Sequence, residues 1–94
     1  MLLVVPVRPD VGKTIPAVDH LGTARIQTVR IDHNPLYYDL IHRFDEAAGV
    51  QVVLNTSFNL RGEPIVNSPS DALNTFANSG IDTLVMGNYL IDRR

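Results

Sequence analysis

Two capped helix patterns, separated by short apolar runs, constrain the fold of this chain most strongly. Asn34-Pro35 supplies an N-cap and a proline at the first helical position, and Gly49 supplies a C-cap. Ser68-Pro69-Ser70-Asp71 has the form of a capping box and begins a second helix that ends near Gly80. The spacing of apolar residues predicts two buried stripes, formed by Tyr37, Leu40, Ile41, Phe44 and Ala48 and by Leu73, Phe76 and Ala77.

Strand-like segments surround both helices. They are rich in aliphatic and β-branched residues and cover residues 1–5, 23–30, 50–54 and 82–86, with a further apolar run at 89–91. Strands that alternate with helices predict an α/β layered domain, with a mixed α+β domain as the alternative. Because helices separate the later strands, we expect some parallel pairing in a mixed, twisted sheet.

The length of the chain sets a limit of one small domain. Residues 1–94 can bury roughly 60–65% of their unfolded surface, which suffices for a modest core. The composition, 45% hydrophobic and 19% charged, is typical of a folded protein. The first apolar run begins at Met1 without a polar lead-in, as in strands that are covered on both faces. We therefore expect this domain to be a piece of a larger protein.

Charge and residue usage exclude several classes of function. The formal net charge of −2 provides no general attraction to nucleic acids or anionic membranes, so neither is expected as a partner. The lack of cysteine excludes disulfides, thiol nucleophiles and thiolate zinc sites. The spacing of His20, His33 and His42 fits no metal site. The seven-residue apolar opening is too short for a membrane helix and lacks the flanks of a signal peptide, and a cytoplasmic location is expected.

One motif in the N-terminal region imitates a phosphate-binding loop. Val11-Gly12-Lys13-Thr14 has the ending of a P-loop, but the first glycine of that motif is replaced by Val7. Ile15-Pro16 follows where a helix should begin. We therefore interpret the segment as a loop with a solvated lysine.

The sequence VVLNTSFNLRGEPIV contains an unusual concentration of polar residues after an apolar run. Asn55, Ser57 and Asn59 alternate, so they point the same way while extended geometry lasts. One interpretation is turn chemistry, in which these side chains satisfy the backbone of a loop. The other is a ligand site at the carboxyl end of a strand, where short polar side chains bind phosphate oxygens. Arg25 and Arg61 could supply positive charge to such a site.

The same segment carries a family resemblance. TSFNLRGEP, residues 56–64, resembles the T-S-x-N-x-x-G-E-P strand end of YrdC-like domains. The chain from Met1 to Tyr89 resembles the C-terminal part of the nodulation-protein-type O-carbamoyltransferases. The matching stretches are LLVVPVRP, GTARIQTV, NPLYYDLI, GVQVVLNTSFNLRGEPIV and SGIDTLVMGNYL.

The resemblance implies a partial YrdC-like layered domain from a two-step enzyme. In that family a YrdC-like domain uses ATP, with Mg²⁺, and carbamoyl phosphate to form carbamoyl-adenylate with release of pyrophosphate. An N-terminal transfer domain of actin-like fold, which carries iron, then passes the carbamoyl group to a hydroxyl. The present chain lacks the part that corresponds to the transfer domain and the earlier strands of the YrdC-like domain.

Site residues follow from the resemblance by position. Arg25 of GTAR and Ser57 match residues that contact the adenylate, and Asn59 matches the second polar residue of the S-x-N signature. The resemblance implies that Arg25 binds a phosphate or carbamoyl oxygen, with Ser57 and Asn59 as hydrogen-bond partners. Further binding candidates are Asn55, Thr56 and Arg61, and no residue is assigned to catalysis or to a metal.

Two departures from the family leave two functions open. The family reads H-V-D-G-T-A-R where this chain has His20-Leu21-Gly22-Thr23-Ala24-Arg25, which is one residue shorter and lacks the aspartate. The first function is a C-terminal part of an O-carbamoyltransferase that holds part of the adenylate site and is inactive, or nearly so, by itself. The alternative is a non-catalytic nucleotide-binding or partner-binding module that retains the fold.

Overall fold

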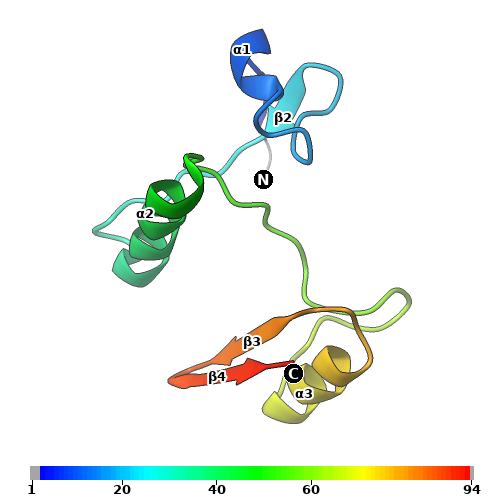
Figure 1. Cartoon of the computed structure of the whole chain (residues 1–94). Helices are drawn as coiled ribbons and strands as arrows, with labels where there is room; N and C mark the ends of the chain where they lie inside the picture. Colours follow the sequence, from blue (N-terminus) through cyan, green and yellow to red (C-terminus); the bar gives the residue numbers. More distant parts are fainter. Residues whose placement is uncertain (1–2, 94) are drawn as a thin grey trace. The chain divides into compact units, whose positions relative to one another are not determined.

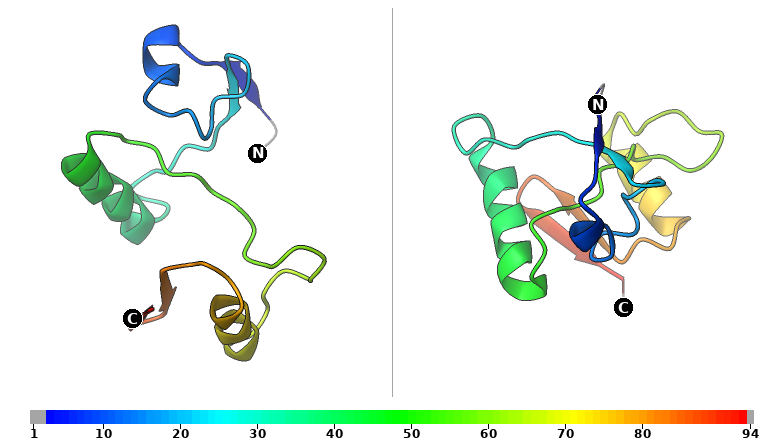
Figure 2. Two further views of the ribbon diagram at one scale, coloured as in Figure 1. Left: turned by 45° about the vertical axis from the view of Figure 1, so that its right-hand side comes forward. Right: turned by 90° about the horizontal axis from the view of Figure 1, so that it is seen from above.

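The computed structural model describes residues 3–93, which form two compact units (Figures 1 and 2). Unit 1 is formed within the range Met1–Asn55, and unit 2 within the range Thr56–Arg94. The described residues contain helices and two separate antiparallel strand pairs. This confirms the mixed α+β form of the predicted fold class.

In unit 1 two short strands pair near the N-terminus. β1 (Val4–Pro6) runs antiparallel to β2 (Thr23–Arg25), with Val5 opposite Ala24. Ala24 is buried, whereas most of the surrounding side chains are exposed or half-buried. A separate, isolated bridge joins His20 to Thr23, the first residue of β2.

A tight turn immediately before β2 contains a strained residue. Leu21 has φ 52° and Gly22 has φ 81°, so both lie in the left-handed region, as a two-residue type I′ turn requires. Two backbone hydrogen bonds between His20 and Thr23, of 2.7 and 3.0 Å, close the turn. The Leu21 side chain is 93% exposed, so no packing offsets its unfavourable backbone conformation.

We expect Leu21→Asn to stabilise this turn by about 1 kcal/mol, because asparagine tolerates positive φ better than leucine does. Hydrogen exchange of the His20 and Thr23 amides should slow roughly threefold to tenfold. Leu36→Asn is the matched control, because Leu36 is also highly exposed, at 81%, but lies in a helix. Equal exchange in Leu21→Asn and the unchanged chain would show that the turn is not strained.

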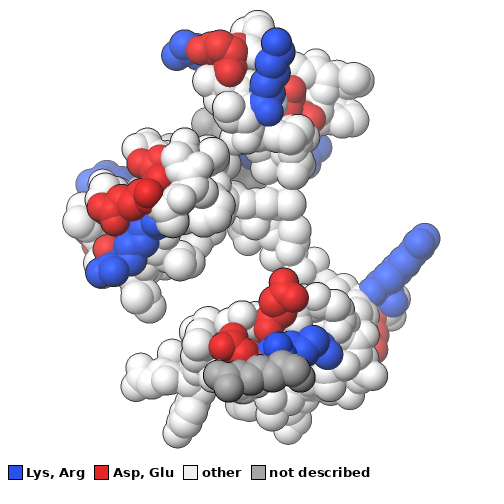
Figure 3. Space-filling model, viewed as in Figure 1, with Lys and Arg blue, Asp and Glu red and all other residues white. Residues whose placement is uncertain are grey.

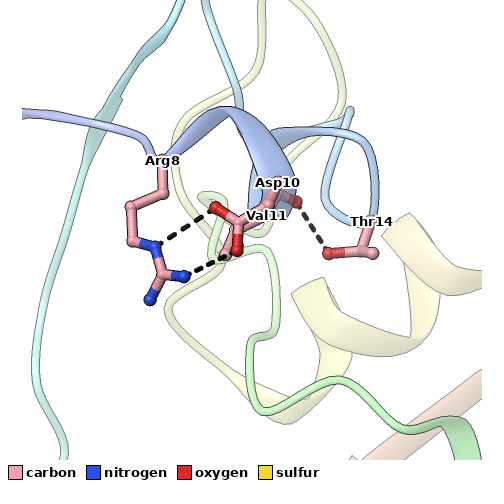
Figure 4. Close-up of polar contacts among 4 residues, drawn as sticks. All are labelled: Arg8, Asp10, Val11 and Thr14. Atoms are coloured by element: carbon pink, nitrogen blue, oxygen red, sulfur yellow. Dashed lines mark hydrogen bonds and ion pairs between the residues drawn. The ribbon is translucent and has the colours of Figure 1, made fainter.

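A one-turn helix occupies part of the region predicted to be loop. α1 (Pro9–Gly12) begins with proline at its first position. Before it, the guanidinium of Arg8 donates to both carboxylate oxygens of Asp10, at 3.2 and 2.6 Å (Figure 4). After it, the hydroxyl of Thr14 donates to the carbonyl oxygen of Val11 at 2.7 Å (Figure 4). The motif that imitates a P-loop is thus a short helix end, held by local contacts.

The first predicted helix is confirmed together with both of its caps. In α2 (Pro35–Ala48) the side-chain oxygen of Asn34 accepts a hydrogen bond from the Tyr37 amide at 3.1 Å. Gly49 follows with φ 74°, and its amide donates to the Asp45 carbonyl at 2.7 Å. These local signals are sufficient to fix both ends of the helix.

The apolar stripe of α2 is only partly covered. Tyr37 and Ile41 are half-buried, but Leu40 is 57% and Phe44 44% exposed. The residues of unit 1 that the structure describes therefore bury only the part of the stripe around Tyr37 and Ile41.

The predicted mixed sheet with parallel pairing does not form within residues 3–93. β2 ends at Arg25 instead of extending to residue 30, and residues 50–54 form no strand. A strand requires a neighbour for its backbone groups, and the described residues provide none for these segments. Of the predicted first strand, Met1 and Leu2 lie outside the described residues.

Unit 2 packs one helix against a hairpin. α3 (Pro69–Ala77) is capped by Ser68, whose hydroxyl accepts a hydrogen bond from the Asp71 amide at 3.1 Å, as predicted. β3 (Thr83–Met86) and β4 (Tyr89–Asp92) pair antiparallel. The last apolar run thus forms a strand of its own.

The core of unit 2 is small. Its buried members are Ala72, Phe76 and Leu84, around which Phe58, Val66, Met86 and Ile91 pack. Phe76 was predicted to face inward and does so, whereas Leu73 is 45% exposed and Ala77 is exposed. Ala72 and Thr75 take the buried positions instead, so the buried face of α3 is rotated relative to the predicted stripe.

A C-terminal arginine holds the end of α3. The Arg93 guanidinium donates to the carbonyl oxygens of Phe76, of Ser79 at 2.9 Å and of Ile81 at 3.1 Å. It also lies 4.8 Å from the centre of the Phe76 ring. Arg93 therefore joins the last turn of α3 to the segment that follows the helix.

We expect Arg93→Ala to lower the free energy of unfolding of unit 2 by about 1–2 kcal/mol. Arg93→Lys should recover less than half of this loss, because an ammonium cannot reproduce the planar set of donors. Amide exchange across α3 measures both effects, with Arg8→Ala in unit 1 as the control. If lysine restored full protection, a simple charge at the helix end would explain the stabilisation.

Candidate functional site

The polar segment found in the sequence forms a closed loop in unit 2. The Val66 amide donates to the Phe58 carbonyl at 3.0 Å and closes the base of the loop. The Glu63 amide donates to the Leu60 carbonyl, also at 3.0 Å. Gly62, with φ 84°, occupies the third position of this tight turn, as in a type II turn. Glycine there is a structural requirement of the loop.

Asn59 stabilises the same turn from inside. Its side-chain nitrogen donates to the carbonyl oxygens of Leu60, at 3.0 Å, and Glu63, at 3.1 Å. The residue is half-buried. The side-chain nitrogen of Asn59 is therefore occupied within the turn. Its side-chain oxygen is the atom that could accept a hydrogen bond from a ligand.

We expect Asn59→Asp to loosen the loop, because aspartate removes both donors and brings a carboxylate close to two carbonyl oxygens. The cost should be about 1–3 kcal/mol, observed as an increase of at least tenfold in the exchange rates of the Glu63 and Val66 amides. Asn88→Asp, in the turn between β3 and β4, is the control for added charge. Unchanged protection in Asn59→Asp would contradict the role assigned to the Asn59 side chain.

The other candidates of unit 2 lie on the surface beside this turn. Thr56 and Ser57 precede the loop and are exposed. Arg61 is exposed at the second position of the turn. The loop and the two residues before it therefore present two hydroxyl groups and one cation to solvent.

Arg25 and Asn55 lie in unit 1, where both line one hollow of about 880 Å³. Arg25 is exposed at the end of β2. The Asn55 side-chain nitrogen donates to the side-chain oxygen of Gln27 at 3.3 Å, also in this hollow. Much of the wall is apolar and includes Ala24, Ile26, Tyr37, Ile41, Val52 and Leu54.

The structure thus gathers the six predicted site residues into two sets, one in each unit. Gln27 joins the set of unit 1, although the sequence did not single it out as a binding residue. Alternation does not single out Gln27, because Ala24 and Ile26, which would lie on the opposite face of an extended segment, line the hollow as well.

The hollow also contains a second arginine in a different environment. Arg30 lines it, but the Arg30 guanidinium pairs with both carboxylate oxygens of Asp32, at 2.9 and 2.6 Å. On the face shown in Figure 3, basic and acidic side chains are interspersed. No helix within residues 3–93 has the length and apolar character needed to cross a membrane.

Comparison with known proteins matches residues 1–93 to the family described as Carbamoyltransferase C-terminus. Nodulation protein NolNO of Sinorhizobium fredii is 47% identical over 95 aligned residues, which cover all of this chain and 14% of NolNO. Nodulation protein NolO of Bradyrhizobium diazoefficiens is 45% identical, with 100% and 17% coverage. The 3'-hydroxymethylcephem-O-carbamoyltransferase of Amycolatopsis lactamdurans is 40% identical over 78 residues, 82% of this chain and 15% of that enzyme. The chain therefore spans 14–17% of the length of these relatives.

Proposed function

Because this chain belongs to the carbamoyltransferase C-terminus family, we propose that it works as the C-terminal part of an O-carbamoyltransferase. It contributes part of the site that binds ATP and activates the carbamoyl group of carbamoyl phosphate as carbamoyl-adenylate. A hydroxyl acceptor then receives the carbamoyl group. The observation that carries this proposal is the family match over residues 1–93, which includes Arg25 and the loop of residues 58–66.

The proposed activation step needs positive charge and hydrogen-bond donors around the α-phosphate of ATP. Water first cleaves carbamoyl phosphate into carbamate and inorganic phosphate. A carbamate oxygen then forms a bond to the α-phosphorus of ATP while the bond from that phosphorus to the bridging oxygen breaks, and pyrophosphate leaves with the electron pair. Negative charge builds on the phosphate oxygens, where fixed donors and cations are most effective. The Mg²⁺ that accompanies ATP belongs to the same proposal.

Each candidate residue has a separate role in this proposal. Arg25 binds a phosphate or carbamoyl oxygen through its guanidinium, whose planar donors match such oxygens in pairs. Ser57 donates its hydroxyl, and Asn59 accepts through its side-chain oxygen. Asn55, Thr56 and Arg61 complete the polar surroundings.

The transfer step depends on parts of the relatives that this chain does not cover. The transfer domain of actin-like fold, with iron, would supply the acceptor site. The name of the Amycolatopsis lactamdurans relative assigns it to the carbamoylation of a 3'-hydroxymethylcephem. For this chain we propose only the class of reaction, with a hydroxyl as the acceptor.

The test uses a chimera in which this chain replaces the matching residues of NolNO, here called the NolNO chimera. With carbamoyl phosphate present, the NolNO chimera should exchange labelled pyrophosphate into ATP, whereas the 94-residue chain alone should not. Exchange by the chain alone would contradict its proposed dependence on the rest of the enzyme. A folded but inactive chimera, beside active NolNO, would contradict the proposed function.

A titration of the isolated chain with ATP separates the alternative function. Resonances of Arg25 and of residues 57–59 should shift if these residues bind the nucleotide. Shifts in the isolated chain combined with an inactive chimera would favour a non-catalytic nucleotide-binding module. No shift and no activity would leave a partner-binding module.

A further inference from the structure

Two segments of unit 1 have the composition of strands but no strand partner. Residues 27–29 and 50–54 make no backbone-to-backbone hydrogen bond within the part of the chain that the structure describes. Both are rich in β-branched residues, which favour strands. A row of unpaired amide and carbonyl groups is a template for pairing with another extended chain.

The same two segments border the hollow described above, and three apolar side chains in or beside them are exposed to solvent. Ile26, next to the first segment, is 48% exposed, and Val52 and Leu54 of the second are 41% and 59% exposed. The wall also includes Tyr37 and Ile41 of α2, which are half-buried. Val52 and Leu54 are two positions apart, so an extended backbone places both on one face. An apolar surface of this kind marks an interaction site.

The chemistry of the hollow selects its occupant. A nucleotide held at Arg25 and Asn55 could not pair with two rows of backbone groups, so these rows require an occupant of their own. An extended polypeptide could pair with them, because strand addition combines main-chain hydrogen bonds with alternating apolar side chains. Five residues of a strand span roughly 17 Å, so a short segment would pair with the whole of residues 50–54.

We propose that residues 27–29 and 50–54 accept apolar strands from the rest of the carbamoyltransferase polypeptide, which thereby cover the hollow of unit 1. The relatives have enough further polypeptide to supply such strands, because the matched region is only 14% of NolNO and 17% of NolO. A segment of the same polypeptide binds at high effective concentration. The inference rests on the proposed function only in its premise that this chain works with the rest of such an enzyme.

Hydrogen exchange of the isolated chain and of the NolNO chimera tests the pairing. In the isolated chain the amides of residues 27–29 and 50–54 should exchange within about tenfold of an unstructured peptide. In the chimera the same amides should exchange at least 100-fold more slowly. Equal exchange in both proteins, with the chimera folded, would overturn the proposal. Protection that appears in the isolated chain as its concentration rises would identify a second copy as the occupant and would also overturn it.

Side-chain substitutions test whether the hollow is covered. Val52→Lys and Leu54→Lys should leave the thermal midpoint of the isolated chain within about 1 °C, because both side chains are already exposed there. In the chimera each should lower the midpoint by about 4 °C or more, because the lysine would enter an apolar contact. Leu36→Lys is the matched control, since Leu36 is 81% exposed and is not part of the wall. Equal effects of Leu36→Lys and Leu54→Lys in the chimera would contradict the proposed cover.

These measurements do not depend on catalysis. Protected segments in an inactive chimera would support the strand pairing and contradict the proposed function. An active chimera with unprotected segments would support the proposed function and contradict the strand pairing.

Discussion

Arg25→Ala is expected to lower carbamoyl phosphate-dependent pyrophosphate exchange by the NolNO chimera at least 100-fold. The proposed step builds negative charge on phosphate oxygens, and loss of one fixed donor to such charge commonly costs a factor of about 10²–10³. Arg25 is exposed at the end of β2, so its removal should change the free energy of unfolding by less than about 0.5 kcal/mol. The loss of exchange would then reflect the site and not the fold.

Arg30→Ala is the matched control for this prediction. Both arginines line the same hollow, but the Arg30 guanidinium is committed to Asp32 at 2.6 Å. Arg30→Ala should therefore retain exchange within about threefold. Arg25→Lys should fall between Arg25→Ala and the unchanged chimera, because lysine keeps the charge but loses the planar pair of donors. Equal losses in Arg25→Ala and Arg30→Ala would indicate a general effect of charge and would contradict a specific contact.

Local signals explain which parts of the fold could be predicted from the sequence. The caps at Asn34, Gly49 and Ser68 each act within a few residues, and the structure confirms all three. The tight turn at Gly62 also follows from local chemistry. Such features depend on neighbours in the chain, so their residue types are sufficient to predict them.

Features that depend on distant partners could not be predicted in the same way. Residues 50–54 have a strand composition, but whether they form a strand depends on a neighbour that their own sequence does not specify. Arg93 finds its acceptors 12–17 residues earlier in the chain, so no local pattern predicts these contacts. The stripe of α3 was misjudged at Leu73, because spacing alone does not determine which face the hairpin covers.

The candidate site shows the same division. Arg25 and Gln27 are two positions apart, so their proximity is a local feature that the sequence can predict, and both line the hollow of unit 1. The bond from Asn55 to Gln27 joins residues 28 positions apart, which no local pattern could predict. The role of Ser57 stays a prediction from family resemblance.

Phe76→Ala is expected to unfold unit 2 while unit 1 keeps its structure. Phe76 is 8% exposed and is the largest of the three buried residues in the core of unit 2. Truncation of a buried phenylalanine costs about 3–5 kcal/mol, which is comparable to the stability that so small a core can supply. The mutation would also remove the ring beneath Arg93.

The loop of the candidate site should lose its order together with this core. Phe58 and Val66, which are joined by the hydrogen bond at the base of the loop, both pack against the buried cluster around Phe76. In Phe76→Ala the Val66 and Glu63 amides should exchange at nearly the rate of an unstructured peptide. The amides of α2 in unit 1 should keep the protection that they have in the unchanged chain. Hydrogen exchange read residue by residue separates the two responses.

Leu73→Ala on the same helix decides whether α3 faces the hairpin as described. Leu73 is 45% exposed, so its truncation should cost less than about 1 kcal/mol and leave the loop amides protected. Phe76→Leu should cost about 1–1.5 kcal/mol, because leucine preserves most of the buried apolar volume. A loss in Leu73→Ala as large as that in Phe76→Ala would mean that the buried face of α3 is the one predicted from the sequence. The support of the loop by this core would then have to be assigned to other residues.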